Sequence, residues 1–105
     1  MLPNIFWSGF TNQERATAIL ELEKIINQFG FIIDFKPFSD ISISLVIEAE
    51  ESHVNHLYDA LIGYLHMKDF DRLHSASSQE RTIYLSVTFS KAMGNLKNEI
   101  PAVPG

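Results

Sequence analysis

The sequence predicts an α+β domain in which a four-stranded antiparallel sheet carries two helices on one of its faces. Three observations predict this class. Residues 41–48 and 82–89 alternate apolar and polar side chains, two segments repeat apolar residues with helical spacing, and turn-forming residues separate the segments. The chain has 105 residues, of which 46% are hydrophobic and 20% are charged. Because domains commonly need on the order of 100 residues, this length suits a single domain.

The first predicted elements are a strand over residues 4–9 and a helix that begins near Thr11. The strand is short, rich in aromatic residues and followed by turn-forming side chains. Thr11, with Glu14 three residues later, has the pattern of a capping box, in which the two side chains satisfy free N–H groups at a helix start. Apolar residues then recur on one helical face, and the helix is expected to end near Gln28.

The next two elements form a predicted hairpin. The alternating pattern at residues 31–36 indicates a strand, and residues 37–40 have the proline, serine and aspartate of a turn. Residues 41–48 alternate more strictly, with isoleucine and leucine on one face and mainly serine on the other. Two strands joined by a short turn pair as an antiparallel hairpin.

A second helix, a long connection and a last strand complete the predicted domain. Ser52 can cap the helix, and apolar residues with helical spacing follow it. The connection over residues 66–81 is polar and unusually long for a compact domain. Residues 82–89 form the last strand, and residues 91–105 are expected to form an extended tail. The order strand, helix, strand, strand, helix, strand within residues 1–90 is the split βαβ, or ferredoxin-like, arrangement.

Composition and charge exclude or disfavour several kinds of chemistry and partner. The chain has no cysteine, so disulfides, zinc-thiolate sites and cysteine nucleophiles are excluded. The net charge is −5, from 13 acidic and 8 basic side chains, which disfavours nucleic acid and anionic membranes as partners. No stretch approaches the roughly 18 apolar residues of a membrane helix, and the N-terminus lacks a signal-peptide pattern. We therefore expect a cytoplasmic protein.

Both predicted helices cover the same face of the sheet, which leaves the other face open. Alternation places small hydroxyl groups and a few apolar side chains on that open face: Ile32, Asp34, Ser42, Ser44, Val46, Tyr84, Ser86 and Thr88, with either Phe6 or the pair Ile5 and Trp7. A solvated face is one interpretation, since antiparallel sheets can face water. Contact with a second subunit is favoured, because the apolar members would otherwise lie together in water. The predicted homodimer interface contains Ser42, Ser44, Val46, Tyr84 and Ser86.

Candidate metal-binding or catalytic groups are few. His53 and His56 have a spacing that can hold a metal ion, but the sequence places no third ligand beside them. The long connection gathers four titratable residues without the spacing of a calcium loop: His66, Asp69, Asp71 and His74. Solvated histidines and a polar loop are the simpler interpretations, so no catalytic residue, metal or cofactor is expected. Proton transfer by a histidine of the connection stays an alternative.

Residues 29–48 read Phe-Gly-Phe-Ile-Ile-Asp-Phe-Lys-Pro-Phe-Ser-Asp-Ile-Ser-Ile-Ser-Leu-Val-Ile-Glu. In this stretch a helix ends at a glycine, a strand and a serine-bearing turn follow, and the next strand reads Ile-x-Ile-Ser-hydrophobic-Val-hydrophobic. Ser39, Ile41, Ile43 and Ser44 fall on this pattern without a gap. The stretch resembles the ACT domains at the C-terminal end of aspartokinases, and the resemblance extends over about residues 4–65.

The resemblance implies a stand-alone regulatory module of ferredoxin-like fold that pairs with a second copy. It also implies an amino-acid ligand, bound by the loop after the first strand and by the start of the second strand. The residues at these places are Gly9, Phe10, Thr11, Asn12, Phe31 and Ile32. The chain carries no kinase domain, so the regulated activity is expected to belong to another protein.

The residues leave two other classes of protein open. One is a small dimeric α/β-barrel enzyme, which would place a pocket between the sheet and the helices, lined by Trp7, Tyr84 or a histidine. The other is an interaction protein without a small ligand.

Overall fold

The computed structural model describes residues 3–74 and 76–89, and the predicted tail over residues 91–105 lies outside the described residues. Seven elements follow one another: β1 (Ile5–Thr11), α1 (Arg15–Asn27), β2 (Gly30–Ser39), β3 (Ser42–Glu50), α2 (Glu51–Ile62), β4 (His66–Met67) and β5 (Glu80–Phe89). The α+β class and its two helices are confirmed for the described residues. The sheet has five strands there, because part of the predicted connection forms β4.

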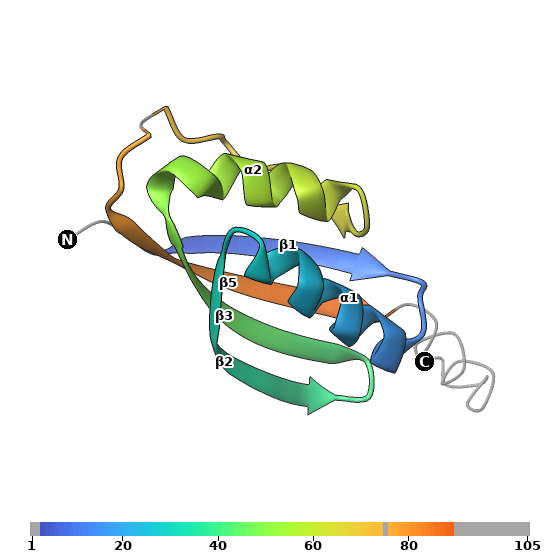
Figure 1. Ribbon diagram of the computed structural model, residues 1–105. Helices are drawn as coiled ribbons and strands as arrows, with labels where there is room; N and C mark the ends of the chain where they lie inside the picture. The colour runs from blue at the N-terminus through green and yellow to red at the C-terminus, as the bar shows by residue number, and fades with distance from the viewer. Residues whose placement is uncertain (1–2, 75, 90–105) are drawn as a thin grey trace.

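The strand order is β2-β3-β5-β1-β4, with β1 and β5 parallel and the other neighbours antiparallel (Figure 1). The predicted four-stranded antiparallel sheet is therefore wrong, and the ferredoxin-like arrangement is not confirmed. The physical reason is the segment after β4. Instead of entering the last strand directly, the chain returns along α2 over residues 68–74 and 76–79, which reverses the direction of β5. As a result, β5 lies antiparallel to β3 and between β3 and β1.

Side-chain hydrogen bonds hold the returning segment against α2. The Asn55 side-chain amide donates to the Leu73 carbonyl, and its oxygen accepts from the Leu73 N–H, both at 2.9 Å. The Tyr58 hydroxyl donates to the Lys68 carbonyl at 2.7 Å. Two residues of one helix face thus fix both ends of the stretch from residue 68 to residue 73.

The start of α2 is capped by this same connection. The backbone N–H groups of Glu51 and Ser52 donate to the carbonyls of Gln79 and Ser77, at 2.9 and 3.0 Å. These are N–H groups that a helix cannot satisfy internally. The helix begins at Glu51, one residue before the predicted cap, because a distant segment supplies the acceptors.

The first helix begins later than the sequence predicts. It starts at Arg15, and Glu14 is its N-cap, with Glu14 Oε1 accepting from the Thr17 N–H at 3.0 Å. Thr11 still belongs to β1, and its Oγ1 accepts from the Gln13 N–H at 3.1 Å in the turn that leaves the strand. The predicted capping box is wrong because the strand extends to Thr11 and takes that side chain out of the helix start.

The core lies between the sheet and the two helices, which cover the same face (Figure 1). Alternate side chains of β1, β3 and β5 point into it and are at most 7% exposed: Ile5, Trp7, Ile43, Leu45, Ile47, Ala49, Ile83, Leu85, Val87 and Phe89. The helices add Ala18, Leu22, Ile26, Val54, Leu57, Tyr58 and Leu61. Full burial of a Leu or Ile side chain stabilises the fold by about 1.5–3 kcal/mol, so this face dominates stability.

The alternation of β2 is interrupted, which corrects one predicted position. Register shifts occur between Ile32 and Asp34 and between Pro37 and Ser39. Ile32 pairs with Ile47 and packs against the core, although the sequence placed it on the open face. A bulge inserts a residue on one strand, so simple alternation assigns the wrong face beyond it.

An ion pair is buried where α2, β5 and the start of β1 meet. Arg81 and Glu51 are each 7% exposed, and Arg81 Nη1 lies 2.6 Å from Glu51 Oε2. Arg81 Nη2 donates to the Pro3 carbonyl at 3.1 Å, and the Ser77 hydroxyl donates to Glu51 Oε1 at 2.9 Å. This cluster joins three segments that are far apart in the sequence: Pro3 before β1, the start of α2, and residues 77–81 at the start of β5.

We expect Arg81→Met to lower the free energy of unfolding by about 3–5 kcal/mol, because it removes the cation beside a buried carboxylate. The double variant Arg81→Met with Glu51→Leu removes both charges together and is expected to lose much less. Urea unfolding followed by circular dichroism measures both variants. A double variant less stable than Arg81→Met alone contradicts this expectation.

Gly30 and Gly63 provide a matched test, because an added Cβ would be crowded by β3 at Gly30 and would have room at Gly63. A Cβ at Gly30 would clash with the Glu48 carbonyl and lie 2.9 Å from Ala49 Cβ. At Gly63, where φ is −69°, the nearest atom would be the Ala60 carbonyl oxygen at 3.4 Å. Gly30→Ala is expected to destabilise by about 1 kcal/mol or more. Gly63→Ala is expected to stabilise by about 0.4–1 kcal/mol. Thermal unfolding compares the two, and shifts of the same sign would refute this assignment.

Candidate functional site on the open sheet face

The face of the sheet without helices carries exposed aromatic rings on neighbouring strands. Phe6 of β1 stacks on Tyr84 of β5, with 5.2 Å between ring centroids and 17° between ring planes. Phe10 stacks on His66 of β4, at 4.7 Å and 21°. Hydroxyl side chains lie between these two stacks along β1 and β5. The face therefore combines flat apolar surfaces with small polar groups.

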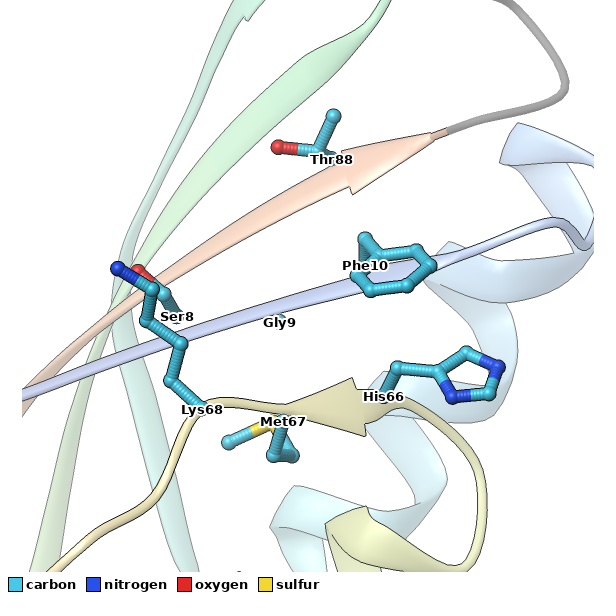
Figure 2. Close-up of a pocket in the computed structure, with 7 residues that line it drawn as sticks. All are labelled: Ser8, Gly9, Phe10, His66, Met67, Lys68 and Thr88. Carbon is cyan, nitrogen blue, oxygen red and sulfur yellow. The ribbon is translucent and has the colours of Figure 1, made fainter.

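A pocket of about 590 Å³ opens on this face where β1, β4 and β5 meet (Figure 2). It is lined by Ser8, Gly9, Phe10, His66, Met67, Lys68 and Thr88. Figure 2 shows His66 near one end of β4 and Lys68 at the other, with Thr88 above them on β5. Its volume lies within the range of roughly 300–1,000 Å³ that is typical of small-molecule pockets.

Backbone pairing between β1 and β4 positions the two basic residues. Gly9 pairs with Met67, and the Lys68 N–H donates to the Ser8 carbonyl at 2.9 Å. His66 and Lys68 are two residues apart on an extended segment and so face the same side, while Met67 packs against the core. A Cβ at Gly9 would lie 2.7 Å from Met67 Sδ, so glycine permits this close approach.

The lining is locally basic in an acidic protein. None of its seven residues is acidic, whereas the chain as a whole has a net charge of −5. Lys68 supplies an ammonium group, and Ser8 and Thr88 supply hydroxyl groups that can donate or accept. The stacked rings of Phe10 and His66 form a flat wall beside them. This arrangement can bind a small anion that also carries a planar or apolar part.

Two of the predicted ligand residues, Gly9 and Phe10, line this pocket. Thr11, the next residue, is buried and pairs with Phe89. Asn12 is exposed beyond the end of β1 and is not part of the lining. The predicted loop therefore contributes to the pocket only through its strand residues.

The other two predicted ligand residues lie far from the pocket within one chain. Across the sheet, the pairing of successive strands aligns Ile32 with Ile5, the first residue of β1. Phe10 lies near the other end of that strand. Phe31 precedes Ile32 on β2, and β3 and β5 lie between β2 and β1. The structure thus does not bring the two halves of the predicted ligand site together.

The predicted interface residues lie on the open face: Ser42, Ser44, Val46, Tyr84 and Ser86. The neighbours of each along its strand are buried, which confirms the faces of β3 and β5. From β1, Phe6 belongs to the open face, and Ile5 and Trp7 are buried. Whether these residues meet a second subunit stays a prediction.

The sequence did not indicate Lys68 as a site residue, and it indicated His66 only as a candidate metal ligand or proton-transfer group of the polar connection. The reason is local: β4 has two residues, too few for an alternation signal. Its pairing with β1 also depends on contacts between residues distant in the sequence. The unusual length of the connection was the one signal that pointed to this segment.

Neither of the considered metal clusters assembles in the part of the chain that the structure describes. Within residues 3–74 and 76–89, no group of three or more histidine, aspartate or glutamate residues is placed to hold a metal ion. His53 Nδ1 instead lies 3.3 Å from the Phe29 carbonyl oxygen.

Neither described helix has the length and apolarity needed to cross a membrane.

No protein-family model matches this chain, and neither curated proteins nor solved structures give a match to it. What points to a role is therefore the chemistry of the pocket and of the exposed aromatic face.

The Phe10–His66 stack is open to a direct spectroscopic test. Phe10→Leu is expected to move the His66 ring proton signals downfield in a ¹H–¹³C spectrum, because the shielding current of the stacked ring is lost. Phe6→Leu removes the other exposed phenylalanine of β1 and is expected to leave the His66 signals in place. Equal responses to both variants would show that the rings do not stack as described.

Proposed function

We propose that this chain is a non-catalytic regulatory module of the ACT-like kind, which acts as a homodimer and binds a small molecule with a carboxylate group, such as an amino acid. The observation that carries the proposal is the pocket on the open face, which Lys68, His66 and Phe10 line together with two hydroxyl groups and no acidic side chain. The regulatory role and the cytoplasmic location are inferred from the sequence, and the position of the ligand is inferred from the pocket.

An amino acid matches the chemistry of this lining. Its carboxylate can accept a hydrogen bond from the Lys68 ammonium group, and hydrogen bonds between ionised groups are roughly twice as strong as those between neutral groups. Its ammonium group can donate to the hydroxyl oxygens of Ser8 and Thr88. A flat side chain can lie against the ring wall of Phe10 and His66.

The packing beneath the sheet favours a binding module over the α/β-barrel enzyme. That enzyme would need an open pocket between sheet and helices beside Trp7, Tyr84 or a histidine. Trp7 is buried, and its ring contacts Tyr58 and Phe70 edge-on, with centroids 5.3 and 5.2 Å away. Tyr84 and His66 face the opposite side of the sheet, away from the helices.

Thermal unfolding in the presence of single amino acids tests the proposed ligand class. An amino acid at 100 times its dissociation constant is expected to stabilise the protein by about 2.7 kcal/mol. Lys68→Met is expected to weaken binding roughly tenfold or more, because it removes the cation of the pocket. Lys24→Met is the matched control, since Lys24 is an exposed lysine of α1 paired with Glu21.

A wild-type protein whose unfolding temperature does not respond to any amino acid or small carboxylate would overturn the proposed ligand. An equal loss of affinity in Lys68→Met and Lys24→Met would remove the pocket as its location.

A further inference from the structure

The strand β2 forms one edge of the sheet and exposes a row of large apolar side chains. Phe31, Ile33, Phe35 and Phe38 are 69%, 52%, 40% and 69% exposed. The strand has ten residues, whereas the strand at the opposite edge, β4, has two. A long edge with exposed apolar residues is a template for pairing with a further strand.

Two opposite charges lie at the centre of this edge. Asp34 and Lys36 pair with Val46 and Ser44 of β3, so both face the open side of the sheet. Lys36 Nζ lies 3.8 Å from Asp34 Oδ2, and both side chains are largely exposed. Phe35, between them, pairs with Leu45 and faces the side of the helices.

We propose that two copies of this chain join edge to edge through β2, antiparallel, with the twofold axis at Phe35. This inference rests on the homodimer in the proposed function and names the surface that forms it. In this register, Asp34 of each copy lies opposite Lys36 of the partner subunit, and the two Phe35 side chains meet at the axis.

The charge pattern favours a second copy as the occupant of this edge. A twofold interface must be complementary to itself, and opposite charges placed symmetrically about Phe35 meet that condition. Two chains that each carry a net charge of −5 repel one another at long range. A contact between copies therefore needs local charge complementarity, which the centre of β2 supplies.

The irregularities of β2 limit the pairing to two copies. Register shifts border the stretch from Asp34 to Pro37, and within that stretch the pairing with β3 is regular. Bulges and a proline obstruct strand pairing at an edge, so the pairing between copies is confined to this short stretch around Phe35. Because both copies use the same edge, the assembly closes as a dimer. The pocket lies beside β4, at the opposite edge, and stays open.

Charge exchange at the two central residues tests this dimer by sedimentation velocity on the full chain. Asp34→Lys alone and Lys36→Asp alone each place like charges across the axis, and each is expected to raise the dimer dissociation constant roughly tenfold or more. An equal mixture of the two variants is expected to form a heterodimer, because lysines of one then face aspartates of the other. The double exchange in one chain is expected to restore the homodimer. Both positions are exposed, and circular dichroism checks that each variant folds.

The control variants separate this edge from the open face. Ser86→Lys changes the middle of the open face, away from β2, and is expected to leave the dimer intact. The chain has no native cysteine, so Phe35→Cys gives a single thiol at the proposed axis. Directly opposite Cβ atoms lie about 4.5–5.5 Å apart in such strands, near the reach of a disulfide. Oxidation is expected to cross-link Phe35→Cys but not Leu20→Cys, a variant at an exposed position of α1.

Two results would overturn the inference, and they differ from one another. A dimer broken by Ser86→Lys but not by Asp34→Lys excludes the β2 edge and keeps a homodimer that pairs through its open face. A wild-type monomer at tens of micromolar excludes both the edge pairing and the homodimer, while the amino-acid pocket is still decided by thermal unfolding.

Discussion

The buried ion pair between Arg81 and Glu51 determines where the last strand lies. It holds the beginning of β5 against the beginning of α2, and the second nitrogen of the same guanidinium holds Pro3, just before β1. Two strands that start from one anchored point run in the same direction. The parallel pairing of β1 with β5, and the position of β5 between β3 and β1, follow from this constraint.

The same constraint builds the pocket. Because β5 must begin at the start of α2, the chain has to return along that helix after reaching its far end. Before it returns, it runs beside β1 as β4, which brings His66 and Lys68 to the open face. The Tyr58 hydroxyl then fixes the Lys68 carbonyl at 2.7 Å. A helix that belongs to the core thus positions a charged residue of the site on the opposite side of the sheet.

The parts of the fold that the sequence predicts well are those decided by local alternation. β3 and β5 are paired on both sides, so their register is regular, and apart from Arg81 each inward residue is apolar. β2 lies at the edge, where bulges are tolerated, and alternation fails there at Ile32. The strand order was not predictable in this way, since it depends on pairing between residues far apart in the sequence, such as Ile5 of β1 with Ile83 of β5. Gly9 and Phe10 were expected in the ligand site only because the family resemblance implies it, whereas Lys68 reaches the pocket through the pairing of β4 with β1, which no local pattern indicates.

The two proposed surfaces lie at opposite edges of one sheet, so the proposed pairing and the proposed ligand do not compete for the same residues. In the proposed dimer β2 faces the second copy, whereas β4 borders the pocket, with β3, β5 and β1 between them. Edge pairing leaves the open faces of both copies side by side, so the exposed Phe6–Tyr84 stack of each stays accessible. A ligand held at β4 lies next to the returning segment rather than next to the dimer axis. The Tyr58 hydroxyl joins the pocket residue Lys68 to α2, and the two hydrogen bonds of Asn55 hold Leu73, further along the same segment, against that helix.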